Sequence, residues 1–218
     1  MGIGHIAAGI AFKKLDAKTN AAWFVFAALL ADFLLWVLIL VGKEQLIIPD
    51  DYAQIRYMRF VFPISHGILA SVGWAILIAG VAFAFLRDSR SALLVGLASM
   101  THIFLDWLVH VVPFEVIGGL TLEGLGLWKN IKASVMIEFL LSVGCLFLYL
   151  KSTSSRTALG RFGMVVFIAL LMIVMFGGQL FAPMPDSVQQ IASSSIVTLL
   201  AIVLVVRWLD SKRSTQMS

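Results

Sequence analysis

Charge and cysteine are both scarce in this chain. Only 13% of its 218 residues are charged and 61% are hydrophobic, whereas a soluble domain has about a quarter charged and about half apolar residues. A soluble core of this length cannot hide so many apolar side chains, which excludes an ordinary soluble fold. The single cysteine, Cys145, excludes an intramolecular disulfide and a cysteine-based zinc site.

The basic residues do not indicate a nucleic-acid-binding protein. The formal charge of +4 comes from Lys and Arg in short segments between apolar runs, where such residues set membrane topology. The N-terminus also lacks the pattern of a cleavable signal peptide, because Lys13 and Lys14 follow the first apolar stretch instead of preceding it. We therefore expect membrane lipid as the partner of this chain, and no nucleic acid.

Long apolar runs are what the chain has in abundance. They cover residues 20–42, 64–86, 91–112, 132–151, 158–182 and 188–209. Each is close to the roughly 20 residues that cross about 30 Å of hydrocarbon. The runs predict an all-α integral membrane protein of about six spans, with one polytopic domain over 1–210 and a polar tail over 211–218.

The first 15 residues are apolar but too short to span a bilayer. They predict a short interfacial or re-entrant helix that turns at residues 16–20 and leads into the first span.

The orientation of the chain in the membrane follows from the basic residues of the loops. Eleven of the 16 Lys and Arg residues fall on the side of the two termini, so the positive-inside rule predicts that both termini are cytoplasmic.

Histidine and aspartate occur where charge is otherwise absent. The four histidines, His5, His66, His102 and His110, lie in or at the edge of apolar segments, as do Asp32, Asp106 and Glu138. An ionisable group at membrane depth costs several kcal/mol unless it is paired, solvated or liganded. A shared divalent cation explains the cluster economically, and zinc suits imidazole and carboxylate ligands.

The strongest local pattern lies in the third span. His102 and Asp106 are four residues apart and share one helix face, and His110 follows one turn later. At about 1.5 Å per residue, Asp32 and His102 lie at similar depth, and a folded-back N-terminal segment would bring His5 to them. The same estimate puts His66 and His110 nearer the outer surface, at the mouth of such a site.

At these residues the sequence resembles the YdjM-type family of bacterial and archaeal inner-membrane proteins, which are described as metal-dependent hydrolases. The matching segments are Ile3-Gly4-His5, Ala31-Asp32, Pro63-Ile64-Ser65-His66, Thr101-His102 with Asp106 and His110, and Gly124-Leu125-Gly126-Leu127-Trp128. The resemblance implies a multi-pass protein of the inner (plasma) membrane, with a metal site built from the family's His and Asp positions.

Together these observations assign expected roles. The candidate metal ligands are His5, Asp32, His66, His102 and Asp106. The candidate catalytic groups are Asp32, His66 and Asp106. Accessory groups are His110, Glu138 and Ser65, and the expected substrate entrance is Gly124, Gly126 and Trp128. The reaction would be metal-assisted hydrolysis of a lipid or lipid-linked substrate.

Two other functions fit the same residues. The His and Asp side chains could line the pathway of a transporter or a proton relay. They could also serve only to pair helices in a structural or regulatory membrane protein. Metal-assisted hydrolysis is favoured because the ionisable groups concentrate in the first half of the chain, whereas a transporter more often has broken helices in both halves.

Overall fold

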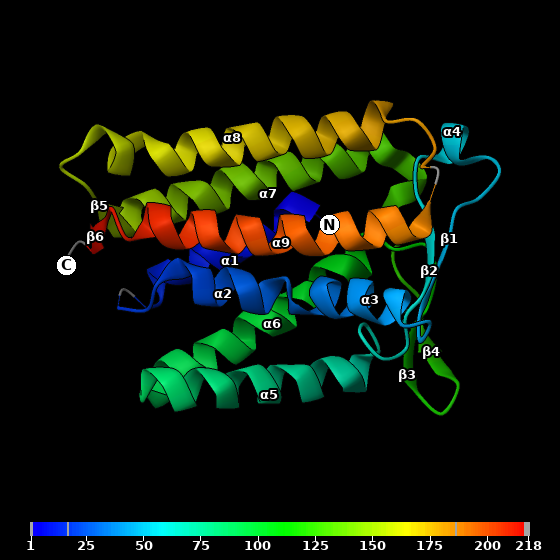
Figure 1. Cartoon of the computed structure of the whole chain (residues 1–218), viewed down its shortest axis with the longest axis horizontal. Coiled ribbons are helices and arrows are strands. Elements are labelled where there is room, and N and C mark those ends of the chain that lie inside the picture. Colours follow the sequence, from blue (N-terminus) through cyan, green and yellow to red (C-terminus); the bar gives the residue numbers. More distant parts are fainter. Residues whose placement is uncertain (1, 17, 186, 216–218) are drawn as a thin grey trace.

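Helices make up most of the protein in the computed structural model, which describes residues 2–16, 18–185 and 187–215 (Figure 1). The helices are α1 Gly2–Ala11, η1 Phe12–Lys14, α2 Ala21–Ala28, α3 Leu30–Leu40, α4 Tyr52–Ile55, α5 Ile68–Leu86, α6 Ser89–Val109, η2 Leu127–Asn130, α7 Ile131–Ser152, α8 Ala158–Phe181 and α9 Val188–Asp210.

The long helices are membrane-spanning in length and composition. In the described part of the chain, five helices are long and apolar enough to cross a membrane: α5, α6, α7 with η2, α8 and α9. The bent pair α2 and α3 makes a sixth span if its two helices are counted as one. α8 faces outward along most of its length, with Phe181 78% exposed and Ile173 69% exposed. Apolar side chains so placed require lipid as their solvent, and the predicted all-α membrane fold is confirmed.

The first span is broken. The sequence predicts one helix over 20–42, but α2 and α3 meet at Leu29 with a bend of 48°. Neither proline nor glycine lies at the break, so the backbone itself does not require it. Instead, the imidazole of His102 reaches the carbonyl of Ala28 at 2.7 Å. A side chain that inserts into the helical hydrogen-bond ladder is a recognised cause of a kink.

The N-terminal helix α1 lies inside the bundle instead of at its surface. Ile3, Ile6 and Ile10 are fully buried, and they share a core cluster with residues of α2, α7, α8 and α9. Figure 1 shows α1 enclosed between α2, α7 and α9. Gly9 permits this close packing, because a Cβ there would lie 2.7 Å from the Cα of Val25. The expected approach of His5 to Asp32 and His102 involves only early spans, whereas α1 also packs against α7, α8 and α9.

Three short antiparallel strand pairs in the described residues close the two ends of the bundle. β1 Gln45–Ile47 pairs with β2 Arg59–Val61, and β3 Phe114–Ile117 pairs with β4 Leu120–Leu122. Both pairs lie at one end in Figure 1, while β5 Thr153–Ser154 and β6 Ser214–Thr215 pair at the end where the C-terminus lies. Tail residues 216–218 lie outside the described residues.

Polar side chains define where the helices begin. Asn20, Asp88, Asn130, Thr157 and Ser187 each accept a hydrogen bond from a backbone amide in the first turn of α2, α6, α7, α8 and α9. Such N-caps satisfy amides that have no partner within the helix. The caps fix the ends of the spans, and therefore the positions of the residues that the spans carry inward.

Candidate metal site

Asp106 of α6 lies at the centre of a buried cluster of imidazoles. Its Oδ2 is 3.3 Å from the Nε2 of His66, 3.3 Å from that of His102 and 3.2 Å from that of His110. Its Oδ1 is 3.0 Å from the Nε2 of His5. The four rings come from α1, the turn before α5, and α6 with its C-cap, so residues far apart in sequence converge on one carboxylate.

The partner of His102 fixes its tautomer. Its Nδ1 lies 2.7 Å from the carbonyl oxygen of Ala28, which can only accept a hydrogen bond. Nδ1 therefore carries the proton, and in the neutral ring Nε2 presents a lone pair to Asp106. The carbonyl of Ala28, at the break between α2 and α3, therefore determines that Nε2 is the nitrogen of His102 that can bind a ligand.

A short chain of hydrogen bonds orients His66 in the same way. Glu44 accepts from the amides of Ile64 and Ser65 at 2.9 and 2.8 Å, and the hydroxyl of Ser65 donates to Glu44 at 2.6 Å. The Ser65 oxygen is then an acceptor for the Nδ1–H of His66, 2.8 Å away. The neutral ring of His66 therefore also presents a lone pair at Nε2.

The two oriented imidazoles face each other without a proton to share. Nε2 of His66 and Nε2 of His102 are 3.0 Å apart, and both also face the acceptor oxygen of Asp106. Lone pairs on atoms this close repel one another unless a proton or a cation lies among them. In their neutral forms the two imidazoles therefore have no hydrogen between their Nε2 atoms, an arrangement suited to hold a positive species.

His5 and His110 complete the surroundings. The ring of His5 stacks on that of His102 at 3.8 Å, and His110 is the C-cap of α6. Within residues 2–16, 18–185 and 187–215, the Nδ1 atoms of both rings are buried without a hydrogen-bond partner. A buried polar atom without a partner in a native fold calls for an explanation such as an ion or water.

Two groups of ligand atoms in the described residues meet the spacing of a metal site. One is His66, His102 and Asp106, and the other is His5, Asp32 and His102, with the ligand atoms of each group lying within 4.8 Å of one another. Asp32 differs from the rest because its side chain is 25% exposed. Its Oδ1 lies 3.8 Å from Nε2 of both His66 and His102, so it stands at the edge of the cluster.

A cavity of about 300 Å³ opens onto the cluster. Asp32, His66, Asp106 and His110 form its polar wall, and aromatic residues, including Trp36, Phe60 and Trp128, form much of the rest. Its far wall is α9, which contributes Ser194, Ser195 and Thr198. Asp32 therefore faces a small cavity whose other walls carry hydroxyl and apolar groups.

Glu138 acts on the position of α1. Its side chain is buried, and its Oε1 accepts from the amide of Gly4 at 2.9 Å. A carboxylate at the N-terminus of a helix satisfies an amide that has no intrahelical partner and interacts favourably with the helix dipole. The sequence left Glu138 between an accessory and a helix-pairing role. The contact with Gly4 makes it an anchor for the helix that carries His5.

The depth estimate for His66 and His110 was wrong. Both were expected nearer the outer surface than His5, yet both approach Asp106 as closely as His102 does. His110 reaches back because side chains on a helix point toward its N-terminus and residues four apart meet. His66 precedes α5, in a turn closed by its amide on the carbonyl of Phe62 at 3.1 Å.

Of the expected entrance residues, Trp128 lines the cavity, with its ring 4.4 Å from that of His110. Gly124 and Gly126 instead pack on the end of α6. The amide of Gly126 donates to the carbonyl of His110 at 3.0 Å, and a Cβ on Gly124 would lie 2.3 Å from that same oxygen. These glycines let the chain approach and cap α6.

Sequence reasoning missed two parts of the site. Glu44 is 2% exposed and supports His66 through Ser65, but in the sequence it looks like any loop carboxylate beside Lys43. The hydroxyl wall of α9 left a clearer signal, because three consecutive serines and Thr198 interrupt an apolar run. That run was interpreted only as a membrane span.

Comparison of the chain with protein-family models, with curated proteins and with solved structures gave no match.

Proposed function

We propose that this protein is a membrane-embedded, metal-dependent hydrolase of a lipid or lipid-linked substrate. The observation that carries the proposal is the pair of Nε2 atoms of His66 and His102, which face each other and Asp106 as acceptors. A divalent cation would satisfy all three at once. The resemblance to the YdjM-type family agrees with this function, and we propose that membership on the residues quoted for it.

The distances within the cluster suit a transition-metal site. Zinc bonds of about 2.0–2.1 Å to nitrogen and oxygen in a tetrahedral site place neighbouring ligand atoms about 3.3 Å apart. The separations from Asp106 Oδ2 to the imidazoles of His66, His102 and His110 are 3.3, 3.3 and 3.2 Å. The donor set contains nitrogen and carboxylate oxygen only, which favours zinc over magnesium or calcium.

His66, His102 and Asp106 would hold the cation, with His5, His110 and Asp32 completing or flanking its surroundings. Ala28 and the Glu44–Ser65 pair would hold the two principal imidazoles in their ligating tautomers, and partners of this kind commonly raise metal affinity. When bound, the cation would activate a water molecule and polarise an ester or phosphoester oxygen.

Asp32 is the candidate general base. It is the accessible carboxylate of the cluster, and it lines the cavity together with His66 and His110. A base must lie within reach of the proton that it removes, and Asp32 can meet this requirement without leaving the cavity wall. The aromatic and apolar walls would exclude bulk water from the reacting bond and accept the apolar part of a lipid substrate.

A proton relay is the second candidate, and one observation favours it. Glu44, Ser65, His66 and His102 form a continuous series of contacts of 3.0 Å or less. Chains of this kind move protons in membrane proteins. Such a relay would require no bound metal and no hydrolysis, so it makes a different prediction from the principal proposal.

Hydrolysis is tested on the purified protein in nanodiscs that contain a total lipid extract, with zinc or manganese supplied. We expect release of fatty acid or headgroup, detected by mass spectrometry. Asp32→Asn should abolish release while retaining the metal, and His102→Ala should lose both. Glu123→Gln, a change of an exposed loop carboxylate, should alter neither. Metal-independent proton flux without lipid cleavage would replace the proposal by the relay.

We also propose that both termini are cytoplasmic and that the β3–β4 hairpin lies outside, on the basis of the basic residues in the loops. Cysteine labelling can test this orientation because the native Cys145 is buried. A cysteine at Glu123 should react with a membrane-impermeant maleimide on intact cells. Reaction only after the membrane is opened would reverse the orientation.

A further inference from the structure

A second cavity lies at the opposite end of the bundle from the strand pairs β1–β2 and β3–β4. It has a volume of about 890 Å³, against about 300 Å³ at the metal cluster, and shares no lining residue with it. α2 forms its floor through Ala22, Trp23 and Phe26, while α5 and α9 form its two walls. Figure 1 shows α2 running between these two helices.

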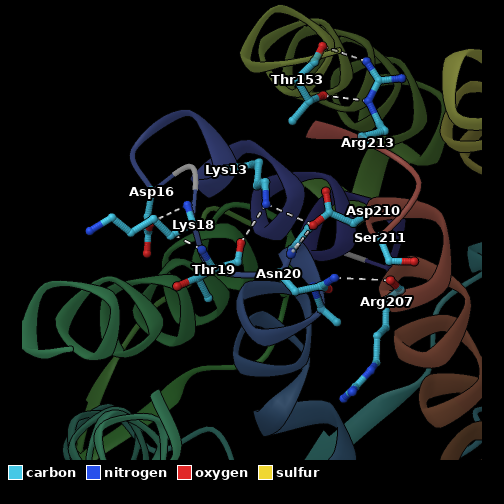
Figure 2. Close-up of polar contacts among 12 residues, drawn as sticks. Lys13, Asp16, Lys18, Thr19, Asn20, Thr153, Arg207, Asp210, Ser211 and Arg213 are labelled. Carbon is cyan, nitrogen blue, oxygen red and sulfur yellow. Dashed lines mark hydrogen bonds and ion pairs between the residues drawn. The ribbon is translucent and has the colours of Figure 1, made fainter. Parts of the chain in front are cut away.

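Polar and apolar residues occupy different ends of this groove. Lys18, Thr19 and Asn20 precede α2, Asp88 and Ser91 lie at the turn into α6, and Arg207 and Ser211 end α9. Figure 2 shows Lys18, Thr19 and Asn20 on the segment before α2, and Arg207 and Ser211 on the neighbouring end of α9, with the side chains of Lys18 and Arg207 extending in different directions. Farther along the helices the lining becomes apolar, through Phe26, Ile78, Val81, Val203 and Leu204.

Two tryptophans mark the level at which the lining changes. Trp23 near the start of α2 and Trp208 near the end of α9 both line the groove, and Trp208 is 50% exposed. Tryptophan is enriched at the boundary between headgroups and hydrocarbon. The polar end therefore lies at headgroup level, and the apolar part lies at the level of acyl chains.

The polar end has two cations without a salt-bridge partner. Among the described residues, neither Lys18 nor Arg207 pairs with a carboxylate within 4.0 Å, in contrast to Lys13. Asp88 lines the groove and Asp16 lies beside it, and the Ser91 hydroxyl is 2.6 Å from Asp16 and 2.8 Å from Asp88. Amides of the preceding loop and of α6 donate to the same two carboxylates. Since both carboxylates are engaged by donors of the protein itself, the two cations remain available to an anionic headgroup.

We propose that this groove binds one anionic phospholipid, with its headgroup at the end that carries Lys18 and Arg207 and an acyl chain between α5 and α9. The side-chain amide of Asn20 donates one hydrogen to the carbonyl of Arg207, and its second hydrogen supplies a further donor at this level. Arginine and lysine both bind phosphate oxygens by charge-assisted hydrogen bonds. The site is separate from the metal cluster and does not depend on the proposed hydrolysis.

Native mass spectrometry of the delipidated, full-length protein tests the proposal with dioleoyl phosphatidylglycerol as the probe. We expect one lipid per chain to be retained at collision energies that remove surrounding lipid, and phosphatidylcholine with the same chains to bind more weakly. The double variant Lys18→Gln/Arg207→Gln should weaken phosphatidylglycerol binding by roughly tenfold to thirtyfold, since each cation near a membrane surface contributes about 1 kcal/mol.

Two control variants separate binding in this groove from effects of total charge and of groove shape. Arg156→Gln/Arg161→Gln removes the same charge just before α8 and in its first turn, outside the groove, and should leave binding unchanged. Val81→Trp fills the apolar part and should weaken both lipids equally. Equal binding of phosphatidylglycerol by the wild type and the Lys18/Arg207 variant would overturn the proposal. So would a dimer whose second copy protects the groove from lipid.

Discussion

Two buried polar clusters in this chain are built on opposite principles. In the first, which we call the Asp210 clasp, the carboxylate of Asp210 accepts from Lys13 at 3.1 Å, from the amide of Ala21 at 2.9 Å and from the hydroxyl of Tyr149 at 2.9 Å (Figure 2 shows Lys13 and Asp210). Lys13 also donates to the carbonyl of Thr19 at 2.9 Å. Every contact joins a donor to an acceptor.

The cluster around Asp106 is arranged differently. In their neutral forms the oriented Nε2 atoms of His66 and His102 are both acceptors, and they face each other at 3.0 Å. A buried polar network that is fully satisfied rigidifies a fold, whereas a partly satisfied one is costly to maintain. The clasp has a structural role, because its contacts join η1, α2, α7 and α9. The pair of facing imidazoles is suited to a bound cation, so the Asp106 cluster is our candidate functional centre.

The largest expected effect falls on the clasp. Lys13→Ala leaves the buried charge of Asp210 without its counter-ion, which typically costs about 3–5 kcal/mol. We expect a large fall in thermal stability of the detergent-solubilised protein. Lys14→Ala, a change of the exposed neighbour, is the control and should have almost no effect. Equal stability of both variants would show that the clasp does not hold the helices together.

Metal removal should have the next largest effect on thermal stability. This effect should depend on the Asp106 cluster and not on the Asp210 clasp. A ligand at 100 times its dissociation constant stabilises the folded state by about 2.7 kcal/mol. We therefore expect a chelator to lower the unfolding temperature and added zinc to restore it. Asp106→Asn should abolish this response, while Tyr149→Phe in the clasp should retain it. A response that survives in Asp106→Asn would place the metal elsewhere.

A smaller effect on zinc affinity should distinguish a hydroxyl that orients His66 from a hydroxyl that is merely buried. Ser65→Ala removes the acceptor of the His66 Nδ1–H, so metal affinity should fall by roughly 10–100-fold. Ser71→Ala removes another buried hydroxyl, one without a hydrogen-bond partner in the described residues, and serves as the control. Equal zinc affinity in the two variants, measured by competition with a chromophoric chelator, would remove Ser65 and Glu44 from the site.

The sequence predicted the features that depend on local pattern. Hydrophobic length identified the spans, and the spacing of His102 and Asp106 identified one face of α6. The N-terminal segment was expected to bring His5 to this face, and the stacking of His5 on His102 agrees with that expectation. These predictions needed only the helix period and the cost of placing ionisable groups in hydrocarbon.

Features that depend on contacts between segments could not be predicted. The depth of each residue in the membrane was estimated along straight helices. The estimate was wrong for His66, which lies in a turn, and for His110, whose side chain points back toward the N-terminus of α6. The break at Leu29 has no local signal in the sequence, because the side chain that reaches the carbonyl of Ala28 there is His102 of another helix. Glu44 became part of the site only when the loop before α5 folded inward.

The metal content of the purified protein, measured by inductively coupled plasma mass spectrometry, tests the proposed metal site most directly. We expect a stoichiometric divalent metal, most simply zinc, in the wild type and in Lys14→Ala. We expect loss of that metal in His102→Ala and Asp106→Ala, with both variants still inserted and helical by circular dichroism. Equal metal content in the wild type and both cluster variants, or none in wild-type protein prepared without chelators, would contradict the proposed site.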